Sequence, residues 1–165
     1  MSKAIRQYVG LFSAVLGYYV IHEGAHLIYA LATGVFKQIN IIGLGMQIDI
    51  FADQMSDVQL AAFCIVGSVA TLIAAYTLIL FANKIGTVDS KVFKACMYYF
   101  TIALLFCDPI YLSILCGYFG GGDMNGISLI VSEIVVRSIY GIIFIINMLL
   151  FIKIVLPKYK RAFQK

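Results

Sequence analysis

The chain has 165 residues, of which 62% are hydrophobic and only 12% are charged, with a formal net charge of +4. A small core cannot bury so much apolar surface, which excludes an ordinary soluble domain and indicates that lipid covers much of the molecule. The basic residues gather at the ends of apolar segments without a stripe of aromatic partners, so we expect no binding to nucleic acid. A chain of this length predicts one domain over residues 1–165.

Four apolar segments meet the requirement of about 20 residues for a helix that crosses a bilayer. They run from Tyr8 to Thr33, from Gln59 to Asn83, from Val92 to Phe119 and from Ile127 to Leu156. The predicted fold is therefore an all-α polytopic membrane protein with about four transmembrane helices. The first segment is too long for the apolar part of a signal peptide, so we expect it to stay in the mature protein.

The connection after the first segment is rich in isoleucine and is interrupted by Gly43-Leu44-Gly45. This pattern over Phe36–Ile50 predicts two short strands around a glycine turn, that is, a short membrane-associated β-hairpin. The hairpin either dips into the membrane surface, with its backbone groups satisfied by strand pairing, or lies on the surface as an ordinary hairpin.

Basic residues cluster at the two chain ends and in the second connection, whereas the first connection is acidic and the third carries no basic residue. Because lysine and arginine accumulate on the cytoplasmic side, this pattern predicts that both termini are cytoplasmic. The small size and the lysine-rich tail favour a bacterial plasma membrane. Four cysteines lie in apolar runs without a C-x-x-C pair, which predicts reduced, membrane-buried thiols at Cys64, Cys96, Cys107 and Cys116.

The first apolar segment contains the sequence His22-Glu23-Gly24-Ala25-His26, which includes both histidines of the chain. On a helix, positions i and i+4 lie on one face, so two imidazoles there can hold one metal ion while the glutamate acts on a water molecule. Ionisable residues at bilayer depth are costly and are typically functional. The simpler alternative is a pair of buried histidines with structural partners only.

A catalytic zinc ion usually takes three protein ligands and one water molecule, so the pattern requires a third ligand from elsewhere. Asp123 follows a glycine-rich stretch that can line a cavity at membrane depth, but it can equally cap the fourth helix. Asp108 stands at about the same depth as His22 by helical rise and precedes Pro109. It is a candidate ligand, a partner that orients a histidine, or only part of a proline kink. Glu133 is expected to form a structural ion pair with Arg137.

These residues together resemble the site-2 protease family of intramembrane zinc metalloproteases. The H-E-x-x-H sequence matches the motif on the family's first core helix. Gly67-Ser68-Val69-Ala70 is similar to a weak form of its G-P-x-x-N element, and Asp123-Met124-Asn125-Gly126 to a degenerate form of its Asp-Gly element. The apolar hairpin has a counterpart in the edge that receives an extended substrate. The chain departs from the family's N-x-x-P element, where Asp108-Pro109 stands instead.

The resemblance implies a zinc-dependent endopeptidase that cleaves a membrane protein or membrane peptide within or beside the bilayer. It implies Zn²⁺ held by His22, His26 and Asp123, with Glu23 as the general base. Two other functions fit the residues: a non-catalytic metal-binding membrane protein, and a small transporter with a histidine and glutamate proton relay. The sequence leaves a homo-oligomer open.

Overall fold

The structure is a computed structural model of the chain, which describes residues 2–42, 45–118 and 122–164. Within these ranges four long apolar helical segments are compatible with an integral membrane protein. They are α1 (Lys3–Thr33), α2 (Asp57–Gly86), α3 (Lys91–Ile110) with a π-helical turn over Tyr111–Leu115, and α5 (Glu133–Leu150), which continues through a second π-helical turn, Phe151–Val155, into α6 (Leu156–Gln164). The prediction of four long helices is confirmed.

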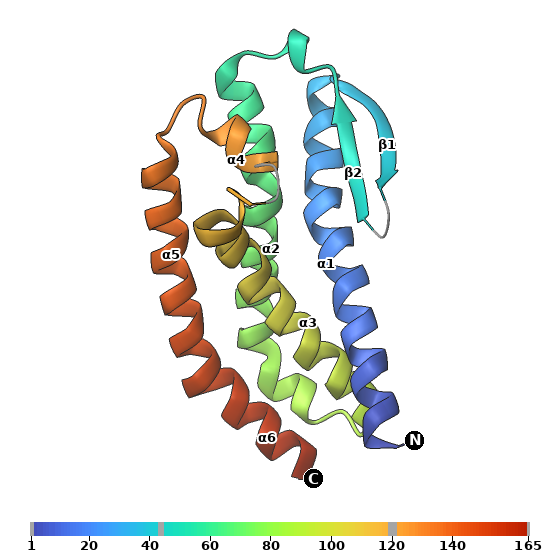
Figure 1. The fold of residues 1–165 in the computed structure, drawn as a ribbon. Helices are drawn as coiled ribbons and strands as arrows, with labels where there is room; N and C mark the ends of the chain where they lie inside the picture. The colour runs from blue at the N-terminus through green and yellow to red at the C-terminus, as the bar shows by residue number, and fades with distance from the viewer. Residues whose placement is uncertain (1, 43–44, 119–121, 165) are drawn as a thin grey trace.

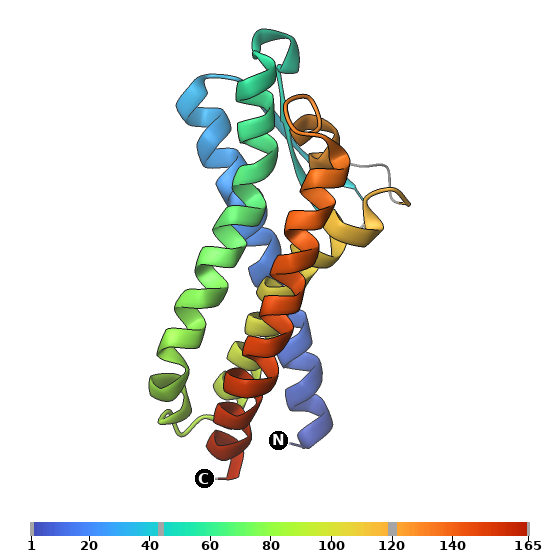
Figure 2. The ribbon, with the colours of Figure 1, turned by 90° about the vertical axis from the view of Figure 1, so that its left-hand side faces the viewer.

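The helices form a bundle in which α2 and α3 lie between α1 and α5 (Figure 1). Both chain ends lie at one end of the bundle, together with the connection from α2 to α3 (Figures 1 and 2). The hairpin and the short helix α4 (Gly122–Ile127) lie toward the other end. The three segments that carry most of the basic residues, namely the N-terminus, the second connection and the C-terminus, therefore lie together at one end of the bundle, as the sequence predicted.

The predicted hairpin is confirmed. Strand β1 (Phe36–Ile42) pairs antiparallel with β2 (Gly45–Ile50), with Ile39 opposite Ile48 and Asn40 opposite Gln47. The glycine turn proposed at 43–44 falls outside the described residues. Helix α1 ends where Gly34 adopts a φ of 74°, a left-handed conformation that glycine takes at little cost. That turn directs the chain from the histidine-bearing helix back alongside it as the hairpin (Figure 1).

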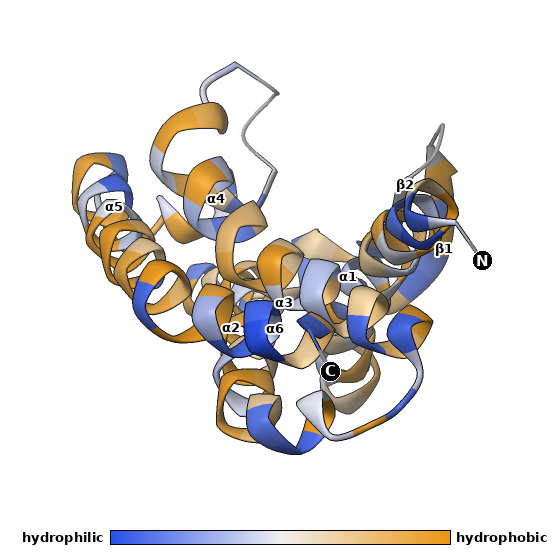
Figure 3. Cartoon of the chain, turned by 90° about the horizontal axis from the view of Figure 1, so that it is seen from below, coloured by the Kyte–Doolittle hydropathy of each residue, from blue (hydrophilic) through white to orange (hydrophobic). Residues whose placement is uncertain are grey.

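Polar contacts between helices fix the bundle, while many large apolar side chains point outward. The Asn147 side chain on α5 donates to the carbonyl of Leu105 on α3 at 2.7 Å and accepts from the Tyr76 hydroxyl on α2 at 2.9 Å. Exposed apolar side chains occur on every long helix. In Figure 3, hydrophobic residues colour much of the length of the long helices. A surface of this kind suits contact with acyl chains.

The predicted bounds on either side of the third connection were wrong. The fourth was expected to begin at Ile127, but α5 begins at Glu133, because Ile127 ends the separate helix α4 and Ser132 starts the next one. The third was expected to reach Phe119, whereas its last helical turn ends at Leu115. Phe119 itself lies outside the described residues. The apolar pattern is nearly continuous across this region, so hydropathy does not reveal the short helix that interrupts it.

Candidate metal site

The two histidines of the motif meet on the inward face of α1, where both are almost fully buried. Their four-residue spacing brings His22 Nε2 and His26 Nε2 to 3.2 Å from each other. Phe63 on α2 packs against the His26 ring, with 4.7 Å between the ring centroids. Two ring nitrogens that face the same point in a protein interior are a suitable pair of ligands for one metal ion.

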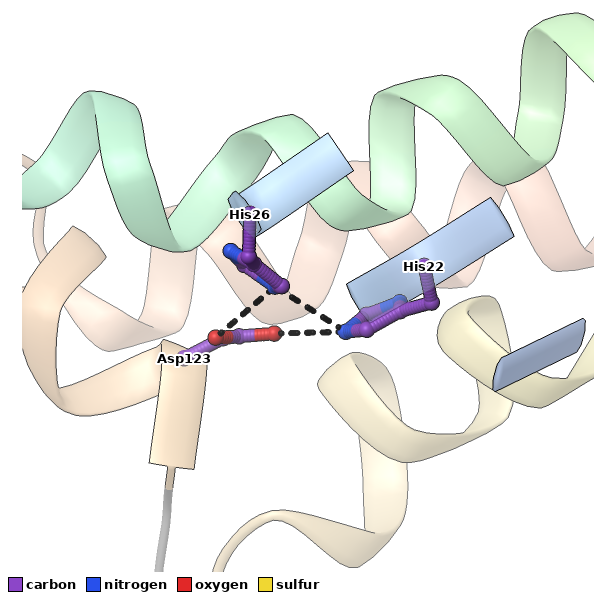
Figure 4. A group of neighbouring side chains, drawn as sticks. All are labelled: His22, His26 and Asp123. Carbon is purple, nitrogen blue, oxygen red and sulfur yellow. Dashed lines mark hydrogen bonds and ion pairs between the residues drawn. The ribbon is translucent and has the colours of Figure 1, made fainter. Parts of the chain in front are cut away.

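Helix α4 brings Asp123 to the same point. One carboxylate oxygen, Oδ2, lies 3.3 Å from His22 Nε2, and the other, Oδ1, lies 3.7 Å from His26 Nε2. Figure 4 shows the three side chains pointing toward one another from α1 and α4. One possible ligand atom from each residue lies within 4.8 Å of the others, so this group could hold a metal ion. Burial raises the pKa of Asp123, but hydrogen bonds with His22 and His26 outweigh it, so the pKa lies below its ordinary value.

Zinc–ligand bonds of about 2.0–2.2 Å put two ligand atoms of a tetrahedral site about 3.3–3.6 Å apart. The separations of 3.2, 3.3 and 3.7 Å between the candidate ligand atoms are close to this range. Gly67 on α2 adds an independent observation. A Cβ atom at this position would lie only 2.5 Å from His26 Nε2 and 2.9 Å from His22 Nε2. The missing side chain therefore keeps open the space beside both ligand nitrogens.

A buried carboxylate holds His22 from the opposite side of its ring. Asp108 Oδ1 lies 3.2 Å from His22 Nδ1 and accepts a hydrogen bond from the Tyr18 hydroxyl at 2.5 Å. The Thr71 hydroxyl donates to its other oxygen. Because a carboxylate only accepts, a His22 ring that binds a metal through Nε2 would carry its proton on Nδ1 and donate it to Asp108. Asp108 thus orients a histidine, which is one of the three roles that the sequence left open.

Glu23 lies between the histidines and the hairpin. Its Oε2 accepts a hydrogen bond of 3.2 Å from the backbone N–H of Ile48 on β2. A cavity of about 370 Å³ adjoins this carboxylate and is lined by the site residues and by the β2 residues Gly45, Met46, Gln47 and Ile48. The cavity places a candidate base, three candidate ligands and an edge of a β-strand around one space.

The structure brings together His22, His26 and Asp123, with Glu23 beside the same cavity. Glu133 lies apart from this group and forms the expected ion pair with Arg137 at 2.7 Å. The structure also places Asp123 in the first turn of α4 instead of at the start of α5, so the capping alternative was wrong. The four cysteines are free thiols, as predicted, although Cys107 is exposed on the surface of the bundle.

Sequence reasoning did not identify two polar residues of this site. Tyr18 precedes His22 by four residues and therefore shares its helix face, which is a signal that the spacing contains. Thr71 follows Gly67 by four residues on α2 and shares that face in the same way. His26 Nδ1 is buried and has no hydrogen-bond partner among the described residues. Among the described residues, only His22 thus has a polar partner at its Nδ1.

Searches of protein-family models, curated proteins and solved structures found no match to this chain.

Gly67→Ala is expected to prevent metal binding, because the new methyl group would collide with both ligand nitrogens. Fixed backbone around a closely packed site makes such overpacking cost about 1–3 kcal/mol. Gly24→Ala is the matched control. Position 24 lies inside the histidine motif, yet a Cβ atom there meets nothing within 4 Å. Zinc content of the two purified variants measures the difference, and equal zinc in both would contradict the proposed metal position.

Proposed function

We propose that this chain is an intramembrane zinc metalloprotease that hydrolyses a peptide bond in, or next to, the transmembrane segment of a membrane-bound substrate. The observation that carries the proposal is the meeting of His22, His26 and Asp123 from two separate helices beside the carboxylate of Glu23. A purely structural zinc site needs no base between its ligands. A glutamate inside the histidine pair is the arrangement in which zinc metalloproteases place their general base.

His22, His26 and Asp123 would hold the metal, and Gly67 would leave room for it. Zinc supplies two effects when bound: it lowers the pKa of a water molecule toward about 7, and it polarises a carbonyl. Glu23 takes the proton of the attacking water as general base and passes it to the leaving amine. Asp108 holds the His22 ring so that Nε2 stays directed at the site, with Tyr18 and Thr71 holding Asp108.

The part of β2 that lines the cavity supports a role in holding the substrate. The N–H of Ile48 donates to Glu23 and is therefore turned away from β1, toward the cavity. A helical substrate hides its carbonyls in hydrogen bonds and must unwind before it can be cut. An extended segment that pairs with this edge would lie beside Glu23, in the manner of strand addition.

The experiment that tests the proposal compares new protein N-termini in membranes from cells that produce the wild-type chain or the double variant His22→Ala/His26→Ala at equal levels. We expect N-termini inside transmembrane segments to appear with the wild type only. They should disappear with a zinc chelator and return when zinc is added. Transport or binding without such N-termini would instead favour the proton-relay or the non-catalytic alternative and would overturn the proposal.

A further inference from the structure

A second cavity lies at the end of the bundle opposite the hairpin and α4, near both chain ends and the connection from α2 to α3. It has a volume of about 440 Å³ and is formed by residues of α1, α3 and α6. Four cationic side chains line it: Lys3, Arg6, Lys91 and Lys160. No acidic residue belongs to its lining, so the cavity concentrates positive charge (Figure 3 views the molecule from this end).

The described chain supplies no ion pair to these four cations. Helices α1 and α3 both begin here, and neither has an acidic residue in its first turn. A helix N-terminus carries a partial positive charge and favours anions, so basic residues in these two first turns add to an unfavourable field. An arrangement of this kind is stabilised by a bound anion.

The side chains that line the cavity indicate which kind of molecule bears the anionic group. Tyr98, Tyr99 and Phe163 line it beside the cations. Directly beyond Arg6 along α1, Val9 and Phe12 are exposed apolar residues at the helical spacings i+3 and i+6. The cationic cavity therefore adjoins the apolar outer surface, as expected for a ligand with a charged head and an acyl tail.

We propose that this cavity binds the phosphate-bearing headgroup of an anionic phospholipid. The four cations contact the phosphate and any further negative charge of the headgroup, and the aromatic side chains contact the glycerol and the first part of the acyl chains. Basic pockets between transmembrane helices at the membrane surface recognise anionic headgroups in this way. The inference does not depend on the proposed protease activity, because the metal site and this cavity share no lining residue.

The test titrates the full-length protein in detergent with phosphatidylglycerol, with phosphatidylcholine of identical acyl chains and with inorganic phosphate. Native mass spectrometry measures the bound fraction. We expect the wild type to retain phosphatidylglycerol in preference to phosphatidylcholine. The double variant Lys91→Gln/Lys160→Gln should weaken phosphatidylglycerol binding about ten- to thirty-fold.

The matched control is Lys84→Gln/Arg161→Gln, which removes the same charge at the same end of the bundle but outside the cavity. It should bind phosphatidylglycerol as the wild type does. Equal retention of the two lipids by the wild type would overturn the proposal without reference to any variant. So would an equal loss in both double variants, which would indicate general surface charge. Competition by inorganic phosphate at the same concentration as the lipid would identify a free-anion site instead.

Discussion

Purified protein carrying Asp123→Ala is expected to bind zinc at least about a hundred-fold more weakly than the wild type. Structural zinc sites have apparent binding free energies of about 10–16 kcal/mol, so one ligand of three is worth about 3–5 kcal/mol. The carboxylate lies 3.3 Å from one ligand histidine and 3.7 Å from the other, and its removal leaves only two ligands. Zinc content and a competition titration with a chromogenic chelator measure the loss.

The variant Asp108→Asn tests whether Asp108 is itself a zinc ligand or only orients the ligand His22. Asp108 contacts Nδ1 of His22, on the side of the ring away from Asp123. We expect zinc affinity to fall about 10- to 100-fold, the usual cost of losing such a partner. The fall should be smaller than that for Asp123→Ala. A larger loss for Asp108→Asn would move the third ligand into α3.

The control for this series is Asp53→Ala, on the short helical turn Ala52–Gln54 outside the cavity. Its zinc affinity should equal that of the wild type. Wild-type protein that binds no zinc even after zinc is added would contradict the metal site as a whole, and unchanged affinity in Asp123→Ala would contradict the ligand set.

Length and apolar composition were sufficient to predict the helical frame, because a transmembrane helix must satisfy its own backbone and must be long and apolar. The hairpin was predictable for a related reason: glycines interrupt an isoleucine-rich run of suitable length. The bounds of the fourth segment were not predictable. Ile127, at the end of α4, is as apolar as the start of α5, so hydropathy cannot show that the chain turns between them.

Within the candidate site, the histidine pair followed from spacing along one helix, which is a local property. The position of Asp123 depends on how α4 packs against α2, which no local pattern contains. Gly126 illustrates that packing: a Cβ atom there would come within 2.3 Å of Cys64 Sγ on α2. Close approach of the two helices therefore sets how far Asp123 reaches toward α1.

The role of Asp108 illustrates the same limit. Helical rise placed it at the depth of His22, but depth does not determine which ring nitrogen it meets. Tyr18 and Thr71 reach it from α1 and α2, so three helices contribute to one hydrogen-bonded group. Asp108 is held by these partners on the Nδ1 side of the His22 ring, so it can orient this histidine, whereas Asp123 faces the Nε2 side.

Glu23→Gln is expected to retain zinc and to lose the cleavage of membrane substrates, by about 10²- to 10⁴-fold, the usual contribution of a general base. The amide cannot take a proton from water, but its carbonyl oxygen can still accept the hydrogen bond from Ile48 N–H. The hairpin should therefore keep its place beside the cavity. The measurement combines zinc content with the rate at which new N-termini appear inside transmembrane segments.

Glu133→Gln gives the matched control, because it makes the same chemical change at a glutamate that is half exposed and paired with Arg137 outside the cavity. It should retain both zinc and cleavage. Zinc content and cleavage together separate two causes of inactivity, namely loss of the general base and loss of the metal. Loss of zinc in Glu23→Gln would show that the substitution damaged the metal site. Cleavage that persists in Glu23→Gln with zinc bound would exclude Glu23 as the base.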